Sequence, residues 1–423
     1  MKDSGIEWIG EIPEGWEIVP VRSCFDEVRT KNTDGQEQNA LQFKSGNIIS
    51  KTNFNASMDD YVADTITNYT VVLPDTVMIN GLNLNYDFKS LRVALVKEKG
   101  VITSAYLAIF PDRKKISPQY ATYLFKGYET KMAFHNMGAG IRKTLGYKEF
   151  KNQPLLLPSE KEQNKISAYL DSKCSHIDIM LSKIRSSIEE YKKLKQAVIT
   201  QAVTKGVRGE REMKDSGVEW IGEIPVDWEI SRIKYVSIFE PSCDFRKLTP
   251  ETIITYSPME CIKNGTFERR TSLYGNLAHT LTPFQNGDIV MAKVTPCFEN
   301  GNIAIMNELQ SGYGLGSSEL FVFRPQNINT RYLFYWLQNK LFVHQACATM
   351  TGTGGLKRIS PSFVKNCNIH YPSTAEQAQI AAYLDTKCAE IDKLIAKKEQ
   401  LVKELDSYKK SLIYEVVTGK REV

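Results

Sequence analysis

Two glycine-rich loops contain the side chains best suited to binding phosphate groups. The first reads GAGIRKT over residues 138–144, and the second reads GTGGLKR over residues 352–358. Glycine lets a backbone approach a phosphate closely, and the adjacent cations can neutralise its charge. The candidate contacts are Gly140, Arg142, Lys143, Gly354, Lys357 and Arg358.

These glycines have two other interpretations, a nucleotide-binding P-loop and a plain glycine-rich turn. A nucleotide-binding P-loop is disfavoured because neither loop completes the pattern GxxxxGK[ST] or lies in a clear strand-to-helix context. A glycine-rich turn with solvated cations explains either loop equally well when it is taken alone. The second loop follows the first at the offset that relates the two halves of the chain, and this favours a shared binding role.

Catalytic motifs are missing from the sequence. It contains no HExxH, no GxSxG and no glycine-rich cofactor loop that opens a βαβ unit. Its five histidines, at positions 135, 176, 279, 344 and 370, are isolated from one another. We therefore expect a non-catalytic protein without a metal site, although a diverged nuclease site of scattered carboxylates stays a minor alternative.

The chain is a duplicated cassette. Residues 1–18 recur at 213–230 with three differences, and residues 162–178 recur at 376–392 with 11 of 17 positions identical. The intervening segments, 19–157 and 231–371, share little sequence. The repeat predicts two recognition domains (1–157 and 213–371) and two spacer segments (158–212 and 372–423), with β-rich runs and helices mixed in each domain.

Each spacer segment carries an apolar seam with heptad spacing. Proline and glycine are absent from 160–204 and 374–418, so each segment can form one helix of roughly 65 to 70 Å. Lys195, Lys398 and Lys409 interrupt the seams. The seam positions are Leu170, Ile177, Leu181, Ile184 and Ile188 in the first segment and Leu384, Ile391, Ile395, Val402 and Leu405 in the second.

An apolar seam needs a partner, and the nearest one is its own duplicate. We predict an antiparallel coiled coil of the two helices, with a simple packing hairpin as the plainer alternative. The fold class is then mixed α+β: two globular α/β domains separated by two long helices. Because the junction at 206–213 resembles the chain ends, a pseudo-two-fold circular arrangement should bring Val423 near Met1.

Composition places few limits on the partner. The net charge of +5 and the pI of about 8.5 are basic, but the charge alone does not establish nucleic-acid binding. Eight scattered cysteines suggest neither a zinc site nor a disulfide framework. With no signal-like or membrane-spanning apolar run, we expect a cytoplasmic protein without membrane contact.

Four repeated or ordered motifs carry a family resemblance. These are the opening MKDSGxEWIGEIPxxW, the helix entry PSxxEQ, the helix start AYLDxKCxxID and the loop TPCFENGN at 295–302. Together they resemble specificity subunits of type I restriction-modification systems over essentially the whole chain. The resemblance implies two target-recognition domains, each reading half of a bipartite, asymmetric DNA site, with the helices setting the gap.

The same resemblance implies partners and cofactors. Two adenine-specific methyltransferase subunits would dock on the repeated framework, and two ATP-dependent restriction subunits can join them. S-adenosylmethionine, ATP and Mg²⁺ would then be bound by those partners and not by this chain. The alternatives are a protein-binding scaffold and a regulatory DNA-binding protein that has no modification partner.

The resemblance also suggests which residues contact DNA. Besides the two glycine-rich loops, polar side chains in loops after β-rich runs could discriminate base edges. Turn chemistry alone is an equally good explanation of the asparagines. The additional candidates are Asn80, Asn83, Asn85, Lys293, Thr295 and Asn300.

Overall fold

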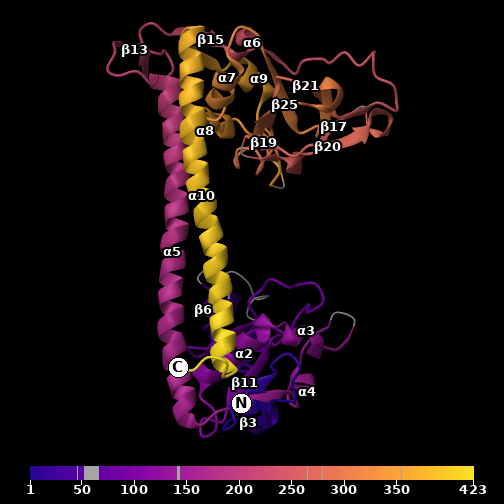
Figure 1. The fold of residues 1–423 in the computed structure, drawn as a ribbon, viewed down its shortest axis with the longest axis vertical. Helices are drawn as coiled ribbons and strands as arrows, with labels where there is room; N and C mark the ends of the chain where they lie inside the picture. Colours follow the sequence, from indigo (N-terminus) through magenta and orange to yellow (C-terminus); the bar gives the residue numbers. More distant parts are fainter. Residues whose placement is uncertain (45, 52–65, 141–142, 264, 279, 354) are drawn as a thin grey trace. The chain divides into compact units, whose positions relative to one another are not determined.

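The computed structural model describes residues 1–423 except 45, 52–65, 141–142, 264, 279 and 354 (Figure 1). Its internal contacts divide the chain into two compact units. The first unit comprises Met1–Arg185 and Gln400–Val423, and the second comprises Ser186–Glu399. Each unit therefore contains a globular part together with segments of both long helices.

The first unit is built around an antiparallel sheet with the strand order β4-β11-β8-β9. The aromatic face of helix α2 packs against this sheet, and Tyr120, Leu124 and Phe125 are fully buried there. The elements are β1 (Lys2–Asp3), β2 (Glu11–Ile12), β3 (Glu17–Pro20), β4 (Phe25–Glu27), β5 (Leu41–Lys44), β6 (Asn47–Ser50), β7 (Thr70–Val72), β8 (Val77–Ile79), β9 (Val93–Leu95), β10 (Gly100–Ile102), β11 (Leu107–Pro111), α2 (Pro118–Thr130), α3 (Ala133–Met137), α4 (Tyr147–Phe150) and β12 (Pro154–Leu157).

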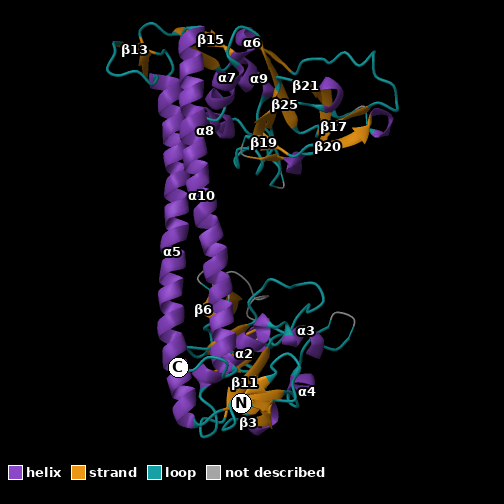
Figure 2. Cartoon of the chain, in the orientation of Figure 1, coloured by secondary structure: helices purple, strands orange, loops and turns teal. Residues whose placement is uncertain are grey.

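The second unit repeats this sheet as β16-β25-β22-β23 and adds a mixed sheet, β20-β17-β24-β21. Figure 2 shows its strands and short helices. The elements are β13 (Met213–Asp215), β14 (Glu223–Pro225), β15 (Glu229–Arg232), α6 (Ile233–Val236), β16 (Ser237–Phe239), β17 (Ile253–Ser257), β18 (Ile262–Lys263), β19 (Thr266–Phe267), β20 (Arg270–Leu273), β21 (Thr282–Gln285), β22 (Ile289–Ala292), β23 (Ile303–Ile305), β24 (Tyr313–Gly316), β25 (Leu320–Pro325), α7 (Thr330–Trp336), α8 (Lys340–Ala348), α9 (Pro361–Asn366) and β26 (Asn368–Tyr371).

The two spacer helices are α5 (Glu160–Lys205) and α10 (Thr374–Val417). In the first unit, Leu170, Ile177 and Leu181 are buried in one apolar cluster with the end of α10. Ile184 is partly buried there, as are Val402 and Leu405. In the second unit the buried seam residues are Ile188, Leu384 and Ile391, while Ile395 is partly buried. The seam residues therefore line the buried side of the helices, as the heptad spacing predicts.

Two of the three lysines that interrupt the seams form ion pairs with aspartates on the other helix. In the first unit Lys409 Nζ lies 2.6 Å from Asp178 Oδ1, and in the second unit Lys195 Nζ lies 2.7 Å from Asp392 Oδ2. The two pairs are equivalent under the repeat, with the roles of α5 and α10 exchanged. Within the first unit a further pair, Arg185–Asp406, follows Asp178–Lys409 in the antiparallel sense. The predicted antiparallel helix pairing and mixed fold class are confirmed.

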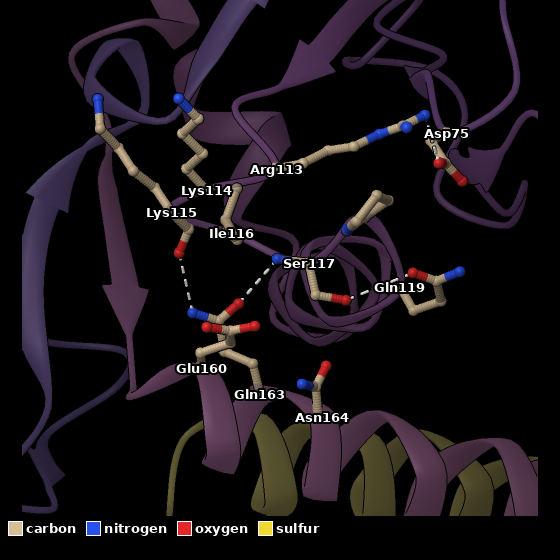
Figure 3. A pocket seen from close by; sticks show the side chains of 11 residues that line it. Asp75, Arg113, Lys114, Lys115, Ile116, Ser117, Gln119, Glu160, Gln163 and Asn164 are labelled. Atoms are coloured by element: carbon tan, nitrogen blue, oxygen red, sulfur yellow. Dashed lines mark hydrogen bonds and ion pairs between the residues drawn. The ribbon is translucent and has the colours of Figure 1, made fainter.

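The repeated helix entry attaches each globular part to its helix. In the first unit the Gln163 amide accepts a hydrogen bond from the Ser117 N–H (2.8 Å) and donates one to the Lys115 carbonyl (3.1 Å) (Figure 3). In the second unit Gln377 accepts one from the Asn329 N–H, also at 2.8 Å. Both glutamines are 2% exposed, so these bonds are shielded from water.

The repeated opening segment packs against a helix end. In the first unit the Tyr414 hydroxyl donates to the Trp8 carbonyl (2.7 Å), and the Lys420 ammonium donates to the Ile9 carbonyl (2.6 Å). In the second unit the Lys205 ammonium donates to the Glu223 carbonyl. The end of the chain is therefore held against its beginning within the first unit, as the circular arrangement requires.

Candidate nucleic-acid interface

In the first unit the two sets of candidate residues form one surface. The loop after β8 runs from Asn80 to Arg92, and it hydrogen-bonds with the glycine-rich loop at two places. The Leu84 N–H donates to the Lys143 carbonyl (3.1 Å), and the Leu145 N–H donates to the Gly81 carbonyl (2.9 Å). The exposed Lys143 is thus held beside the predicted asparagines.

A buried arginine braces the loop after β8. The Arg92 side chain is 1% exposed, and its guanidinium donates to the carbonyls of Asn80 and Leu82, each at 2.9 Å. It also donates to the Asp87 carbonyl and lies 3.6 Å from the Asp87 carboxylate. The Asp87 carboxylate accepts hydrogen bonds from the N–H groups of Lys89 and Ser90. Hydrogen bonds from the side chain and the N–H of Ser90 are the main reason that the Asp87 pKa is lowered to about 2. The loop therefore has a fixed backbone shape.

Glu129 on α2 also contacts this loop, at Arg92. Its carboxylate accepts a hydrogen bond from the Arg92 backbone N–H. Burial raises the Glu129 pKa to about 7, although that hydrogen bond and the nearby charge of Arg92 act in the opposite direction. The base of the loop consequently contains a carboxyl group that titrates near neutral pH.

The second unit joins its two candidate loops in a matching way. The Ile359 N–H donates to the Lys293 carbonyl, and the Thr295 N–H donates to the Lys357 carbonyl, each at 2.9 Å. The Thr295 hydroxyl also accepts from the Lys357 N–H and donates to the Gly355 carbonyl, again at 2.9 Å. The same backbone arrangement therefore presents different side chains in the two units.

The cations of the second unit differ in their surroundings. The Arg358 guanidinium makes a two-point ion pair with Glu319, with N–O distances of 2.9 and 2.7 Å, and the Glu319 pKa is lowered as a result. The Lys293 ammonium lies over the Phe321 ring, 5.6 Å from its centroid. Lys357 is exposed. Lys357 is consequently better placed than Arg358 to meet an anion without giving up an existing partner.

The remaining candidates differ in how far they are exposed to solvent. Asn83 and Asn300 are exposed, whereas Asn80 and Asn85 are partly buried. The Asn80 side chain accepts from the Leu82 N–H, which is the turn role considered for the asparagines. Gly140 has φ +80°, a conformation that favours glycine. The candidates Arg142 and Gly354 lie outside the described residues.

Sequence reasoning missed the residues that shape these loops. Arg92, Glu129 and Glu319 were not candidates, because single charged residues outside a motif are usually solvated. The exposed Tyr86 was also missed, although it ends the loop segment NGLNLNY. An aromatic residue inside a polar loop is the one sequence signal that could have identified it.

Within the ranges that the structure describes, no helix is both long enough and apolar enough to cross a membrane. The described part of the chain also contains no group of three or more His, Cys, Asp or Glu side chains arranged to hold a metal ion.

Comparison with known proteins shows what the chain is similar to. Residues 225–404 match the family model of the type I restriction modification DNA specificity domain. The specificity subunit of the Escherichia coli type I restriction enzyme EcoEI is 32% identical over 163 residues, which cover 37% of this chain and 27% of that protein. The MjaVIII specificity subunit of Methanocaldococcus jannaschii is 23% identical over 97% of this chain and 94% of that protein. The chain is therefore similar to type I restriction-modification specificity subunits, and residues 225–404 match their DNA specificity domain.

The fold is also shared with a solved structure. It comes from work on the complex assembly and conformational transition of the type I R-M system. It aligns with a TM-score of 0.69 and 14% identity over 97% of this chain and 100% of that one. This similarity concerns the fold alone, and the chain spans about a quarter of the E. coli relative that it matches at higher identity.

Proposed function

We propose that the protein is a non-catalytic subunit that selects the DNA sequence modified by a type I restriction-modification complex. Residues 1–157 and 213–371 would each read one half of a bipartite, asymmetric site, and the spacer segments 158–212 and 372–423 would set the gap. The observation that carries this proposal is the loop arrangement: the same backbone pairing holds unlike side chains in the two units. Equivalent positions with different chemistry are what two unlike half-sites require.

The repeated surfaces support docking of two copies of one partner. Besides the buried seam, each unit exposes apolar side chains one residue before a seam position. In the first unit these are Met180, Leu401 and Tyr408, which are 47%, 42% and 50% exposed. In the second unit they are Leu194, Leu394 and Tyr383, at 48%, 41% and 40%. Met180 and Leu394 are equivalent under the repeat, and so are Leu194 and Tyr408. Each unit therefore exposes a matching apolar strip beside the seam, on which a methyltransferase subunit could dock.

The chemistry would then belong to the partners. S-adenosylmethionine would be bound by the methyltransferase subunits, and ATP with Mg²⁺ by restriction subunits where these are present. The complex would act in the cytoplasm, which fits a chain whose described cysteines are all free.

The proposal is tested by reconstitution with a methyltransferase subunit of a type I restriction-modification system. The mixture should methylate adenine in one bipartite motif, whereas this chain alone should transfer no methyl group. Native mass measurement should give two methyltransferases per chain, and sequencing that detects methylated bases should reveal both half-sites. Methylation without sequence preference, or no stable association, would leave the scaffold alternative instead.

The second unit's glycine-rich loop should contribute to phosphate binding. Exchanging both Lys357 and Arg358 for alanine should weaken DNA binding similarly for all sequences and reduce the slope of log K against log salt by about 1 to 2. We expect most of this change from Lys357, because Arg358 already pairs with Glu319. Fluorescence anisotropy titrations from low to moderate salt measure the slope.

The matched control is Glu319→Gln, which frees the Arg358 guanidinium and should steepen the slope. If the double alanine variant keeps the wild-type slope, the loop does not lie against the phosphate backbone.

A further inference from the structure

The most exposed aromatic side chain in the described part of the chain lies on the braced loop of the first unit. Tyr86 is 72% exposed, and Phe88 follows it at 56%. The Phe88 ring is stacked on His135, with 5.1 Å between centroids and 12° between planes. The Tyr86 N–H and the Asp87 N–H both donate to the Asn83 carbonyl (3.1 and 3.0 Å), which forms the turn that presents Tyr86.

This exposure is imposed by the backbone of the loop. Arg92 holds three carbonyls of the segment from Asn80 to Asp87, and Leu84 anchors it as a fully buried side chain. A flexible loop could fold an aromatic ring onto the protein, but a braced turn keeps it in solvent. Holding an apolar ring in water is unfavourable until a partner covers it.

Two observations favour DNA as that partner over the docking methyltransferase. First, the surface that carries Tyr86 also carries exposed cations: Lys89 lies on the same loop, and Lys143 lies on the loop bonded to it. Second, the feature is not repeated. The equivalent loop of the second unit carries Phe298, which is 3% exposed and belongs to the core. A surface that docks the same partner twice should be duplicated, whereas a surface that reads a half-site should differ.

We propose that Tyr86 stacks against a base or wedges into a base step of the half-site read by the first unit, with Phe88 and His135 supporting it. This inference rests on the proposed function and specifies the contact made at one of its two sites. Aromatic rings contribute substantially to nucleic-acid binding by stacking, and apolar wedges unstack base steps. The second unit would read its half-site without such a ring.

The test uses the full chain assembled with its methyltransferase. Once wild-type methylation has defined the bipartite motif, duplexes carrying 2-aminopurine at successive positions of each half-site are titrated with complex. Apart from the target adenines, which the methyltransferases flip out of the stack, we expect fluorescence to rise at one step of one half-site, and Tyr86→Ala to abolish that rise and weaken binding about ten- to hundredfold. Tyr86→Phe should keep both, because stacking needs the ring and not the hydroxyl.

Tyr235→Ala is the matched control, since Tyr235 is also exposed (62%) but lies on α6 of the second unit. It should leave the fluorescence and the affinity unchanged. The inference is overturned if Tyr86→Ala binds and responds like wild type, or if it loses the methyltransferase during purification, which would make Tyr86 a protein contact. A wild-type complex without any bipartite motif would instead refute the proposed function.

Discussion

Replacing Asp288 with alanine should destabilise the second unit by about 3 to 5 kcal/mol. Asp288 is fully buried just before β22, and its carboxylate pairs with the Arg324 guanidinium through two bonds of 2.8 Å. It also accepts a hydrogen bond from the Gln285 N–H at 2.9 Å. Arg324 is partly buried, and its hydrogen bonds with the Asp288 carboxylate raise the pKa of the guanidinium, although burial acts in the opposite direction. Amide hydrogen exchange should quicken in β22 and β25 but not in β8 of the first unit.

The first unit supplies a matched control for this experiment. At the equivalent turn the Thr76 hydroxyl accepts from the Leu73 N–H, and Phe110 stands where β25 carries Arg324. The double variant Asp288→Thr with Arg324→Phe should therefore recover a large part of the lost stability. If Asp288→Ala alone is tolerated, the buried pair contributes little to the fold.

Glu129→Gln should make the first unit more stable at pH 8 but not at pH 4.5. The Glu129 pKa of about 7 lies above its ordinary value of 4.5, so the folded state retains a proton that the unfolded chain releases. Stability from this group is fully present below pH 4.5 and is lost as the pH rises through 7. The difference corresponds to about 3 kcal/mol at pH 8. Glutamine keeps an oxygen for the Arg92 N–H and has no proton to lose.

Hydrogen exchange in β8 and β9, measured between pH 4.5 and 8 after correction for intrinsic rates, gives the comparison. The exposed Glu190→Gln on α5 is the control, and it should follow wild type at every pH. Parallel curves for wild type and Glu129→Gln would contradict the assignment of the neutral-range titration to this carboxyl group.

Heptad spacing predicted the long helices well because their pattern is local. Seam residues such as Leu170 and Leu384 recur at fixed intervals, and the structure buries both. The lysines that interrupt the seam were visible too, but their partners were not. Asp392 is 197 residues from Lys195 along the chain, and no local pattern connects them.

The candidate site was predictable only in pieces. Sequence indicated two separate loops in each half, whereas the structure joins them through backbone bonds such as Leu145 N–H to the Gly81 carbonyl. Hydrogen bonds between main-chain groups do not depend on residue type, so the sequence does not reveal them. The role of Arg92 was not predictable for another reason. An arginine in a polar stretch is normally expected to be solvated, but Arg92 is buried against carbonyl oxygens.

The attachment of each globular part to its helix has an evolutionary consequence. Gln163 and Gln377 bind main-chain groups of Ser117, Lys115 and Asn329, and main-chain groups are common to all residues. An anchor of this kind places few demands on side chains in the segment it holds. Selection can therefore diversify that segment, or replace it with an unrelated one, while the rest of the molecule stays unaltered.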